Sequence, residues 1–227
     1  MKKIREHISF LSKINIPLFV YLNYFCKNII RIDNSKIIPY KHAVIDFETN
    51  ARIYIGGGDI EIGCDMLRKS KAETRIRLRD HSIWSSKGGC KVSYGSTIEL
   101  LSNAILDTGY FTMNSFSTLI VAEKVIFGQD VMISRNVILY DSDFHSLLDE
   151  KGKVRNYSEP VVIGNHVWIS AKVIVLKGTK IGKDSVIGAN SVVKGKIPAG
   201  VIYHTSFEEK SRVNNGTWSR EKPEERI

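Results

Sequence analysis

An aliphatic residue returns at every sixth position, without a break, in the carboxyl-terminal half of the chain. The repeating residues are Ile163, Ile169, Val175, Ile181, Ile187 and Val193, and a small or β-branched residue follows each of them four positions later, at Val167, Val173, Thr179, Ser185, Ser191 and Ile197. A period of six fits neither the 3.6-residue turn of an α-helix nor the brief alternation of a half-buried strand. It predicts short strands with regular corners, in which three sides make one triangular coil of about 18 residues and stacked coils share one core.

Small residues follow several of the repeating aliphatics, namely Gly164, Ser170, Gly182 and Gly188. Such residues suit tight corners, where a missing or small side chain lets the backbone bend. Upstream, the strand-like pattern begins at about Ala43, becomes irregular between residues 91 and 110, and returns to the six-residue register from Val121.

Two stretches depart from the repeat. Residues 64–73 are charged and predict an inserted loop. Residues 144–160 are polar and predict a longer excursion that protrudes from the stacked coils. Loops of this length inside a compact repeat are usually functional, so the second excursion is the first place to look for a site.

Three arginines, Arg75, Arg77 and Arg79, alternate with apolar residues and therefore share one face of a predicted strand. Aligned like charges repel one another, which is unfavourable unless solvent or an opposite charge compensates them. One interpretation is a solvated face with acidic neighbours such as Asp80, and the others are a subunit contact or an anionic acceptor.

The first residues are basic and then apolar, as in a secretory signal, but Lys13, Asn15 and Pro17 interrupt the apolar run, so we do not expect a signal peptide. From Pro17 onward the apolar residues fall at helical spacing, with Asn15 placed to cap, which predicts an amphipathic helix of about 14 residues. Such a helix is too short to span a bilayer. It could cap the open end of the coils, or its apolar face and flanking cations could rest on an anionic membrane surface.

The formal net charge is +9 and the pI is near 9.4, which favours an anionic partner. Nucleic acid is not expected as that partner, because the basic residues lack aromatic interleaving and any known motif. Cys26, Cys64 and Cys90 show no paired spacing, which is typical of a reducing cytoplasm and not of a disulfide framework or a zinc site. We therefore expect a cytoplasmic protein without a metal.

The repeat, together with the segment Val167-Trp168-Ile169-Ser170 and the segment 187–191, resembles the hexapeptide-repeat acyltransferases, and among them the sugar and polysaccharide O-acetyltransferases. The resemblance implies an all-β solenoid, a left-handed parallel β-helix with an N-terminal helical extension and a protruding loop. The expected divisions are an N-terminal helical cap over 1–42, the β-helix catalytic domain over 43–202 with its loop at 144–160, and a C-terminal tail over 203–227.

The resemblance also implies that His145, at the start of the long loop, is the catalytic base. A thioester donor is already activated, so the reaction mainly requires that the acceptor lose its proton as it attacks, and an imidazole does this well near neutral pH. Asp141, Asp143 and Glu159 are all candidates to orient the imidazole, and the sequence does not choose among them. Asn114 and Asp143 are expected to contact the acceptor.

For the acyl donor, the resemblance implies acetyl-coenzyme A. Trp168 is expected near the donor channel, and Ala171 and Ala189 at backbone contacts with the pantetheine arm. Lys194 and Lys210 are expected near the coenzyme phosphates. The chain departs from the family around Lys194 and after Pro198, so the way in which the tail contacts coenzyme A stays open.

Together these features predict an acetyl-coenzyme A-dependent enzyme that acetylates a hydroxyl of a sugar or cell-surface glycan precursor, such as a lipopolysaccharide precursor. The resemblance implies a homotrimer with active sites between subunits. N-acetylation of an amino sugar nucleotide or a xenobiotic, and a non-catalytic trimeric scaffold, stay open as alternatives. A zinc carbonic anhydrase of the same fold needs three histidines, and here only His145 and His166 are suitably located.

Overall fold

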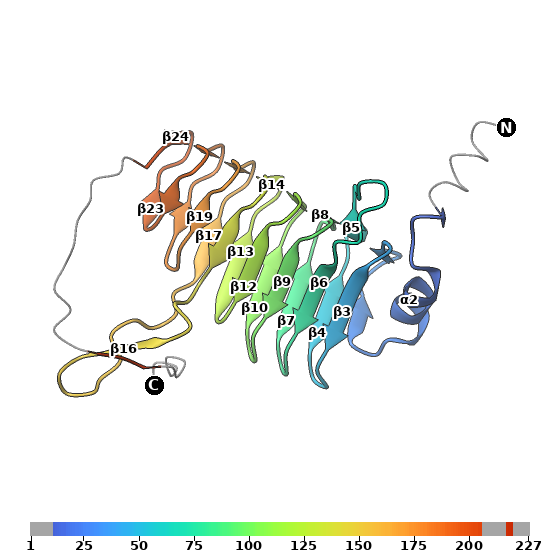
Figure 1. Ribbon diagram of the computed structural model, residues 1–227, viewed down its shortest axis with the longest axis horizontal. Helices are drawn as coiled ribbons and strands as arrows, with labels where there is room; N and C mark the ends of the chain where they lie inside the picture. The colour runs from blue at the N-terminus through green and yellow to red at the C-terminus, as the bar shows by residue number, and fades with distance from the viewer. Residues whose placement is uncertain (1–10, 206–216, 220–227) are drawn as a thin grey trace.

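A computed structural model describes residues 11–205 and 217–219 as a solenoid of stacked coils (Figure 1). Its walls are three parallel sheets. Sheet 1 contains β1 (Ile29–Arg31), β4 (Arg52–Ile55), β7 (Ile83–Ser86), β10 (Ile105–Thr108), β13 (Lys124–Phe127), β17 (Val161–Ile163), β20 (Lys180–Ile181) and β23 (Lys196–Ile197). Sheet 2 contains β2 (Ile37–Pro39), β5 (Ile60–Cys64), β8 (Cys90–Ser93), β11 (Phe111–Met113), β14 (Val131–Ile133), β18 (Trp168–Ile169), β21 (Val186–Ile187) and β24 (Ile202–Tyr203). Sheet 3 contains β3 (Ala43–Phe47), β6 (Thr74–Leu78), β9 (Thr97–Leu100), β12 (Thr118–Val121), β15 (Ile138–Tyr140), β19 (Ile174–Val175) and β22 (Val192–Val193).

Successive strands enter the three sheets in turn, so each coil gives one strand to each wall. The aliphatic repeat is in register from coil to coil, since Ile163 pairs with Ile181 in sheet 1 and Ile169 pairs with Ile187 in sheet 2. In the last coil, which is two residues shorter, the companion residue Ile197 takes the place beside Ile181. All these side chains are buried. The triangular coil predicted from the period of six is therefore confirmed. Regular strands also cross residues 91–110, where the sequence pattern is irregular.

The glycines at the corners are needed for close packing between coils, whereas we expected them to let the backbone bend. Gly164 does not have a left-handed backbone, whereas His166, two residues later, has φ of 53°. A Cβ atom on Gly164 would lie 2.7 Å from the backbone nitrogen of Lys183 in the next coil. These glycines therefore permit the close approach of stacked coils.

The amino-terminal helix is shorter than predicted. It consists of α2 (Ile16–Val20) and a π-helical turn, η1 (Tyr21–Phe25), and it ends before residue 29 because Ile29 already pairs in sheet 1. The predicted cap is confirmed, since Asn15 Oδ1 accepts the Leu18 N–H at 3.2 Å.

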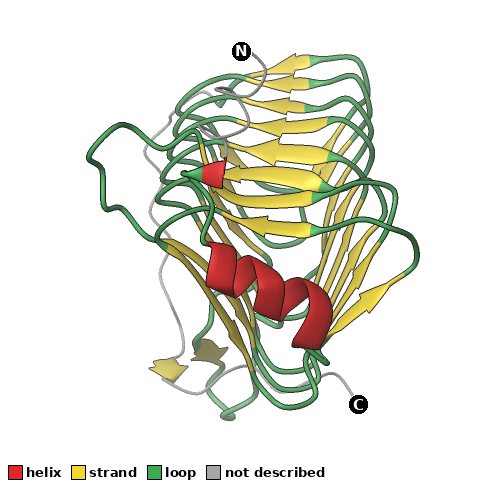
Figure 2. Ribbon diagram, turned by 90° about the vertical axis from the view of Figure 1, so that its right-hand side faces the viewer, coloured by secondary structure: helices red, strands yellow, loops and turns green. Residues whose placement is uncertain are grey.

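The helix lies across the end of the solenoid (Figure 2). Leu22 is buried in the core, and the buried side chain of Asn23 hydrogen-bonds the backbone of Ile37 in both directions. The helix thus covers the first coil, as one of the two interpretations expected. Parallel pairing starts with β1 and β2, upstream of residue 43, while the divisions at 43 and 203 stay predictions. No described helix has the length and apolarity needed to cross a membrane.

Both predicted loops are present. Residues 65–73 join β5 to β6, and residues 141–160 leave the solenoid between β15 and β17. The long loop carries β16 (Ser146–Leu148), which pairs antiparallel with β25 (Thr217–Ser219) from the tail. The tail backbone therefore returns to the loop that contains His145 (Figure 1).

The arginine face is met by acidic neighbours. Arg75 pairs with Glu73 at 2.8 Å, Arg79 pairs with Glu99 at 2.7 Å, and Arg77 lies close to Asp46 and Glu48. Arg75 and Arg77 are exposed, and Arg79 is half-buried. These contacts favour the solvated face, although Asp80 is not one of the partners and instead pairs with His81.

Candidate active site

The residues singled out in the sequence gather at two corners of the solenoid. Corner A links sheet 2 to sheet 3 and consists of residues 114–117, 134–137, 170–173 and 188–191. Corner B links sheet 3 to sheet 1 and consists of residues 141–160, 176–179 and 194–195. Asn114, Ala171 and Ala189 belong to corner A, and Trp168 lies just before it. Asp143, His145 and Lys194 belong to corner B, and Lys210 lies outside the described residues.

Corner A is built from coils in exact register. Met113 pairs with Ile133, Ile133 with Ile169, and Ile169 with Ile187, so the residues that follow them form one column. That column consists of Asn114, Ser134, Ser170 and Gly188. The Trp168 indole N–H donates to Ser134 Oγ at 3.0 Å, while 44% of Trp168 stays exposed. Asn114 and Trp168 therefore belong to the two coils on either side of the coil that contains Ser134.

Ala171 and Ala189 occupy the next column of corner A. The Asn190 N–H donates to the Ala171 carbonyl at 3.1 Å, which ties the two coils together. Within the described residues, the N–H groups of Ala171 and Ala189 have no hydrogen-bond acceptor. Their small side chains leave the backbone accessible, so corner A offers two amides to a slender ligand that lies along the solenoid.

His145 is exposed at the base of the long loop in corner B. The backbone N–H of His145 donates to the backbone carbonyl of Asp143 at 2.8 Å. Phe144, the residue before it, has a left-handed backbone with φ of 60° and packs edge-on against Tyr140, with ring centroids 5.2 Å apart. The chain therefore turns sharply just before His145, and the aromatic contact fixes that turn on sheet 3.

Asp141 has a structural role in the corner of the preceding coil. Its buried carboxylate accepts the N–H groups of Ala122, Glu123 and Lys124 at 2.7–2.8 Å. Burial raises the pKa of Asp141, although these three hydrogen bonds act in the opposite direction. Both carboxylate oxygens are thus engaged by the backbone, which makes Asp141 the weakest of the three candidates to orient His145.

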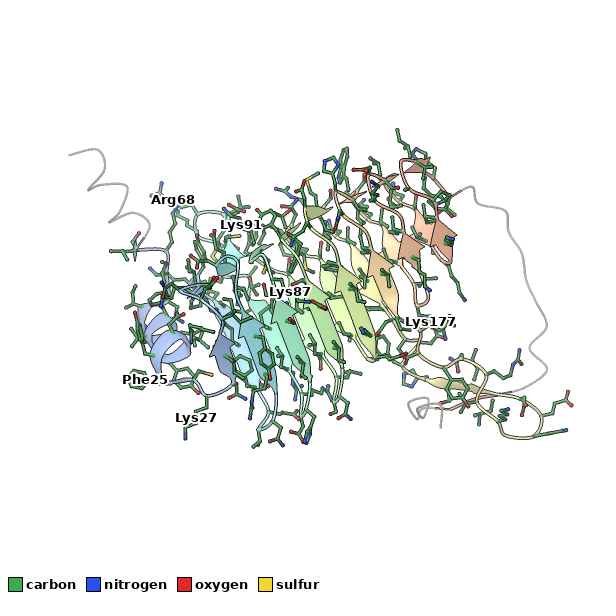
Figure 3. All side chains as sticks on the ribbon, turned by 180° about the vertical axis from the view of Figure 1, so that it is seen from behind. Phe25, Lys27, Arg68, Lys87, Lys91 and Lys177 are labelled. Atoms are coloured by element: carbon green, nitrogen blue, oxygen red, sulfur yellow. The ribbon has the colours of Figure 1, made fainter. Side chains whose placement is uncertain are left out.

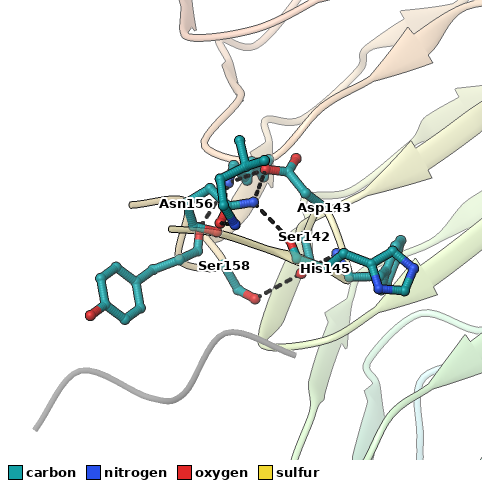
Figure 4. A network of polar contacts seen from close by, with 9 residues as sticks. Ser142, Asp143, His145, Asn156 and Ser158 are labelled. Carbon is teal, nitrogen blue, oxygen red and sulfur yellow. Dashed lines mark hydrogen bonds and ion pairs between the residues drawn. The ribbon is translucent and has the colours of Figure 1, made fainter. Parts of the chain in front are cut away.

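Asp143 belongs to a polar network at the root of the loop (Figure 4). Its Oδ2 atom accepts from Lys177 Nζ at 2.6 Å and from Asn156 Nδ2 at 2.8 Å. Burial raises the pKa of Asp143, but the hydrogen bonds from Lys177 and Asn156 outweigh it and hold the pKa below its ordinary value. For contact with an acceptor, as predicted, Asp143 would have to use Oδ1, which has no partner among the described residues.

Lys177 and Asn156 were missed in the sequence. Lys177 falls between two repeating aliphatics, where lysines are ordinarily solvated, and Asn156 is one polar residue in a polar loop. No spacing rule distinguishes them, because Lys177 bonds the loop of the preceding coil and the partners of Asn156 depend on how that loop folds back.

Corners A and B lie at opposite edges of sheet 3. Four residue steps separate Val137 from Asp141 in one coil, which corresponds to roughly 13 Å of extended chain. His145 and the Ala171–Ala189 column are thus held apart within one chain. His166 is separate from both, at the corner between sheets 1 and 2, where its ring lies 3.2 Å from Asp184.

Comparison with known proteins finds acetyltransferases that are similar to this chain. The family model described as bacterial transferase hexapeptide (six repeats) matches residues 160–195. The galactoside O-acetyltransferase of Escherichia coli is 38% identical over 48% of this chain and 51% of its own length. A putative acetyltransferase of Saccharomyces cerevisiae is 35% identical over 60% of this chain and 78% of its own length. The chain thus spans about half the length of the galactoside enzyme.

Among solved structures, the hexapeptide-repeat acetyltransferase of Vibrio cholerae in complex with acetyl-coenzyme A is 23% identical. The match covers 53% of this chain and 63% of that one, with a TM-score of 0.37.

Proposed function

Since this chain belongs to the hexapeptide-repeat acyltransferase family, whose fold is the left-handed parallel β-helix, we propose that it transfers an acetyl group from acetyl-coenzyme A to a hydroxyl of a sugar or cell-surface glycan precursor. The observation that carries the proposal is corner A with Trp168 just before it, where the N–H groups of Ala171 and Ala189 have no acceptor among the described residues. A pantetheine arm is slender and carries amides of its own, so it fits such a column as an added strand would.

His145 is the general base in this proposal. Its imidazole takes the proton of the acceptor hydroxyl while the oxygen attacks the thioester carbonyl carbon. The carbon–sulfur bond of the resulting tetrahedral intermediate then breaks, and the coenzyme leaves as a thiol after receiving the proton. A positioned base contributes typically 10²–10⁴-fold to such a reaction. The exposure of His145 at the base of a folded loop supports this role.

A homotrimer with active sites between subunits completes the proposal. One chain holds its base at corner B and its donor residues at corner A, so the two meet only if corner B of one copy faces corner A of another. The outer face of sheet 3 lies between these corners and carries the half-buried apolar side chains Ile120, Ile138, Ile174 and Val192. An apolar face of this kind suits contact with a second copy.

The acceptor is a carbohydrate in this proposal, and the net charge of +9 favours an acidic one. The galactoside relative supports a hydroxyl as the acetylated group. An amine of an amino sugar would need the same base, so a panel of acceptors has to decide between them. We place the reaction in the cytoplasm, and the three buried, free cysteines support that location.

A weak contact with an anionic membrane surface is also part of the proposal. Tyr24 and Phe25 are 65% and 70% exposed, and Lys27 stands next to them at the helix end of the molecule (Figure 3). Aromatic residues beside cations are typical of helices that lie on a bilayer surface. We expect the protein to float with phosphatidylglycerol vesicles and not with phosphatidylcholine vesicles, and a Phe25→Ser variant to float less. Equal flotation of the variant and the wild type would contradict the contact.

Acetyl-coenzyme A binding tests the donor site without an acceptor. We expect micromolar affinity by calorimetry, weakened at least about tenfold in Trp168→Ala, because truncation removes a large apolar contact. Thiol release with methyl β-D-galactoside, oligosialic acid and glucosamine then separates hydroxyl from amine acceptors. A folded wild type that does not bind acetyl-coenzyme A would contradict the enzymatic proposal and favour the scaffold.

A further inference from the structure

Lys177 is a buried lysine with only 5% of its surface exposed. It lies in corner B, one coil beyond the long loop, and its side chain points to the root of that loop. Buried ammonium groups are rare and have to be compensated by close partners. Neither corner A nor the proposed chemistry requires Lys177, so its burial calls for an explanation of its own.

The three N–H bonds of the ammonium match three acceptors from the loop. Nζ lies 2.6 Å from Asp143 Oδ2, 3.0 Å from the Asn156 carbonyl and 3.0 Å from the Tyr157 carbonyl. Asp143 belongs to the outgoing leg of the loop, and Asn156 and Tyr157 belong to the returning leg. One side chain from the rigid solenoid therefore fastens both legs.

Asn156 extends this link to His145. Its Nδ2 group donates to Asp143 Oδ2 at 2.8 Å and to the His145 carbonyl at 2.9 Å, and its Oδ1 accepts the Leu147 N–H at 2.6 Å. The backbone on both sides of Ser146 is thus fixed by a buried amide that Lys177 holds in place. Ser158 Oγ, bonded to Ser142 Oγ at 3.0 Å, closes the root of the loop.

We propose that Lys177 is a positioning residue that sets the place of the His145 imidazole through Asp143 and Asn156. This inference rests on the function proposed above. Lys177 does not act on the acceptor, because it is buried and its three N–H bonds are used. The His145 ring points away from Asn156 (Figure 4), so the network fixes the backbone from which the ring projects and leaves the ring accessible.

The first measurement is hydrogen–deuterium exchange of the whole 227-residue chain. In Lys177→Met, we expect the amides of residues 143–157 to exchange at least about tenfold faster, with those of β13 and β14 unchanged. The matched control is Lys180→Met, three residues away, where the lysine is exposed and has no ion pair among the described residues. It should exchange like the wild type. Unchanged exchange in Lys177→Met would overturn the inference.

The second measurement separates positioning from stability alone. With the best acceptor from the panel, kcat of Lys177→Met should fall at least about tenfold while KM for acetyl-coenzyme A stays within about twofold. The double variant Lys177→Met/Asp143→Asn removes the uncompensated charge and keeps an acceptor for Asn156, so it should recover part of kcat. A variant with faster loop exchange but the kcat of the wild type would also overturn the inference.

Failure of the proposed function gives a different pattern. It is seen as a wild type that transfers no acetyl group, or as a His145→Ala variant that is as active as the wild type. The exchange measurement does not depend on either result.

Discussion

Replacing His145 by alanine is expected to lower kcat for acetyl transfer by about 10²–10⁴-fold, the usual contribution of a positioned general base. The imidazole projects from a loop root that is held by Phe144 against Tyr140 and by the Asn156 amide. Alanine keeps this backbone and removes only the proton acceptor. Because the base moves a proton in the transition state and does not hold the donor in the ground state, KM for acetyl-coenzyme A should change little.

Thiol release with the best acceptor of the panel measures this effect. His166→Ala is the matched control, since His166 is equally a surface histidine but lies at another corner beside Asp130 and Asp184. It should keep the kcat of the wild type. A His145→Ala enzyme within about threefold of the wild type would contradict the assignment of the base, as would an equal loss in both variants.

The fold was predictable because its determinants repeat locally. Ile163 and Ile181 stack 18 residues apart, as do Ile169 and Ile187, which is what the period of six requires, and one coil determines the next. The amino-terminal helix was predicted too long because the apolar spacing continues through Ile29, whose side chain is buried in strand β1 instead. Helical spacing alone cannot show where pairing with a later coil takes over.

The grouping of the site residues was less predictable. Ala171 and Ala189 share a column of corner A because each follows a repeating isoleucine by two positions, which places them one coil apart, and Trp168 precedes Ala171 in the same coil. This grouping follows from the sequence. The anchoring of the His145 loop does not follow from the sequence. Lys177 and Asn156 are 21 residues apart, and their contact depends on how an irregular loop folds back. The separation of corners A and B also needed the structure, because it depends on which strands form each wall.

Introducing a charge on the outer face of sheet 3 is expected to abolish the proposed trimer and, with it, acetyl transfer. Ile174 is half-buried in β19, between Ile138 and Val192 of the neighbouring coils. In Ile174→Glu, association would bury an unpaired carboxylate, which is strongly unfavourable. We expect a monomer by light scattering and at least about a 100-fold loss of acetyl transfer, because donor and base would no longer be held together.

Val162→Glu provides the matched control, since Val162 is an outward, half-buried residue of β17 in sheet 1. It should stay trimeric and active, and circular dichroism should show that both variants keep the β-helix. A monomeric Ile174→Glu protein with full activity would mean that one chain carries a complete site, contrary to the separation of corners A and B. A variant that remains trimeric would instead place the subunit contact on another wall of the solenoid.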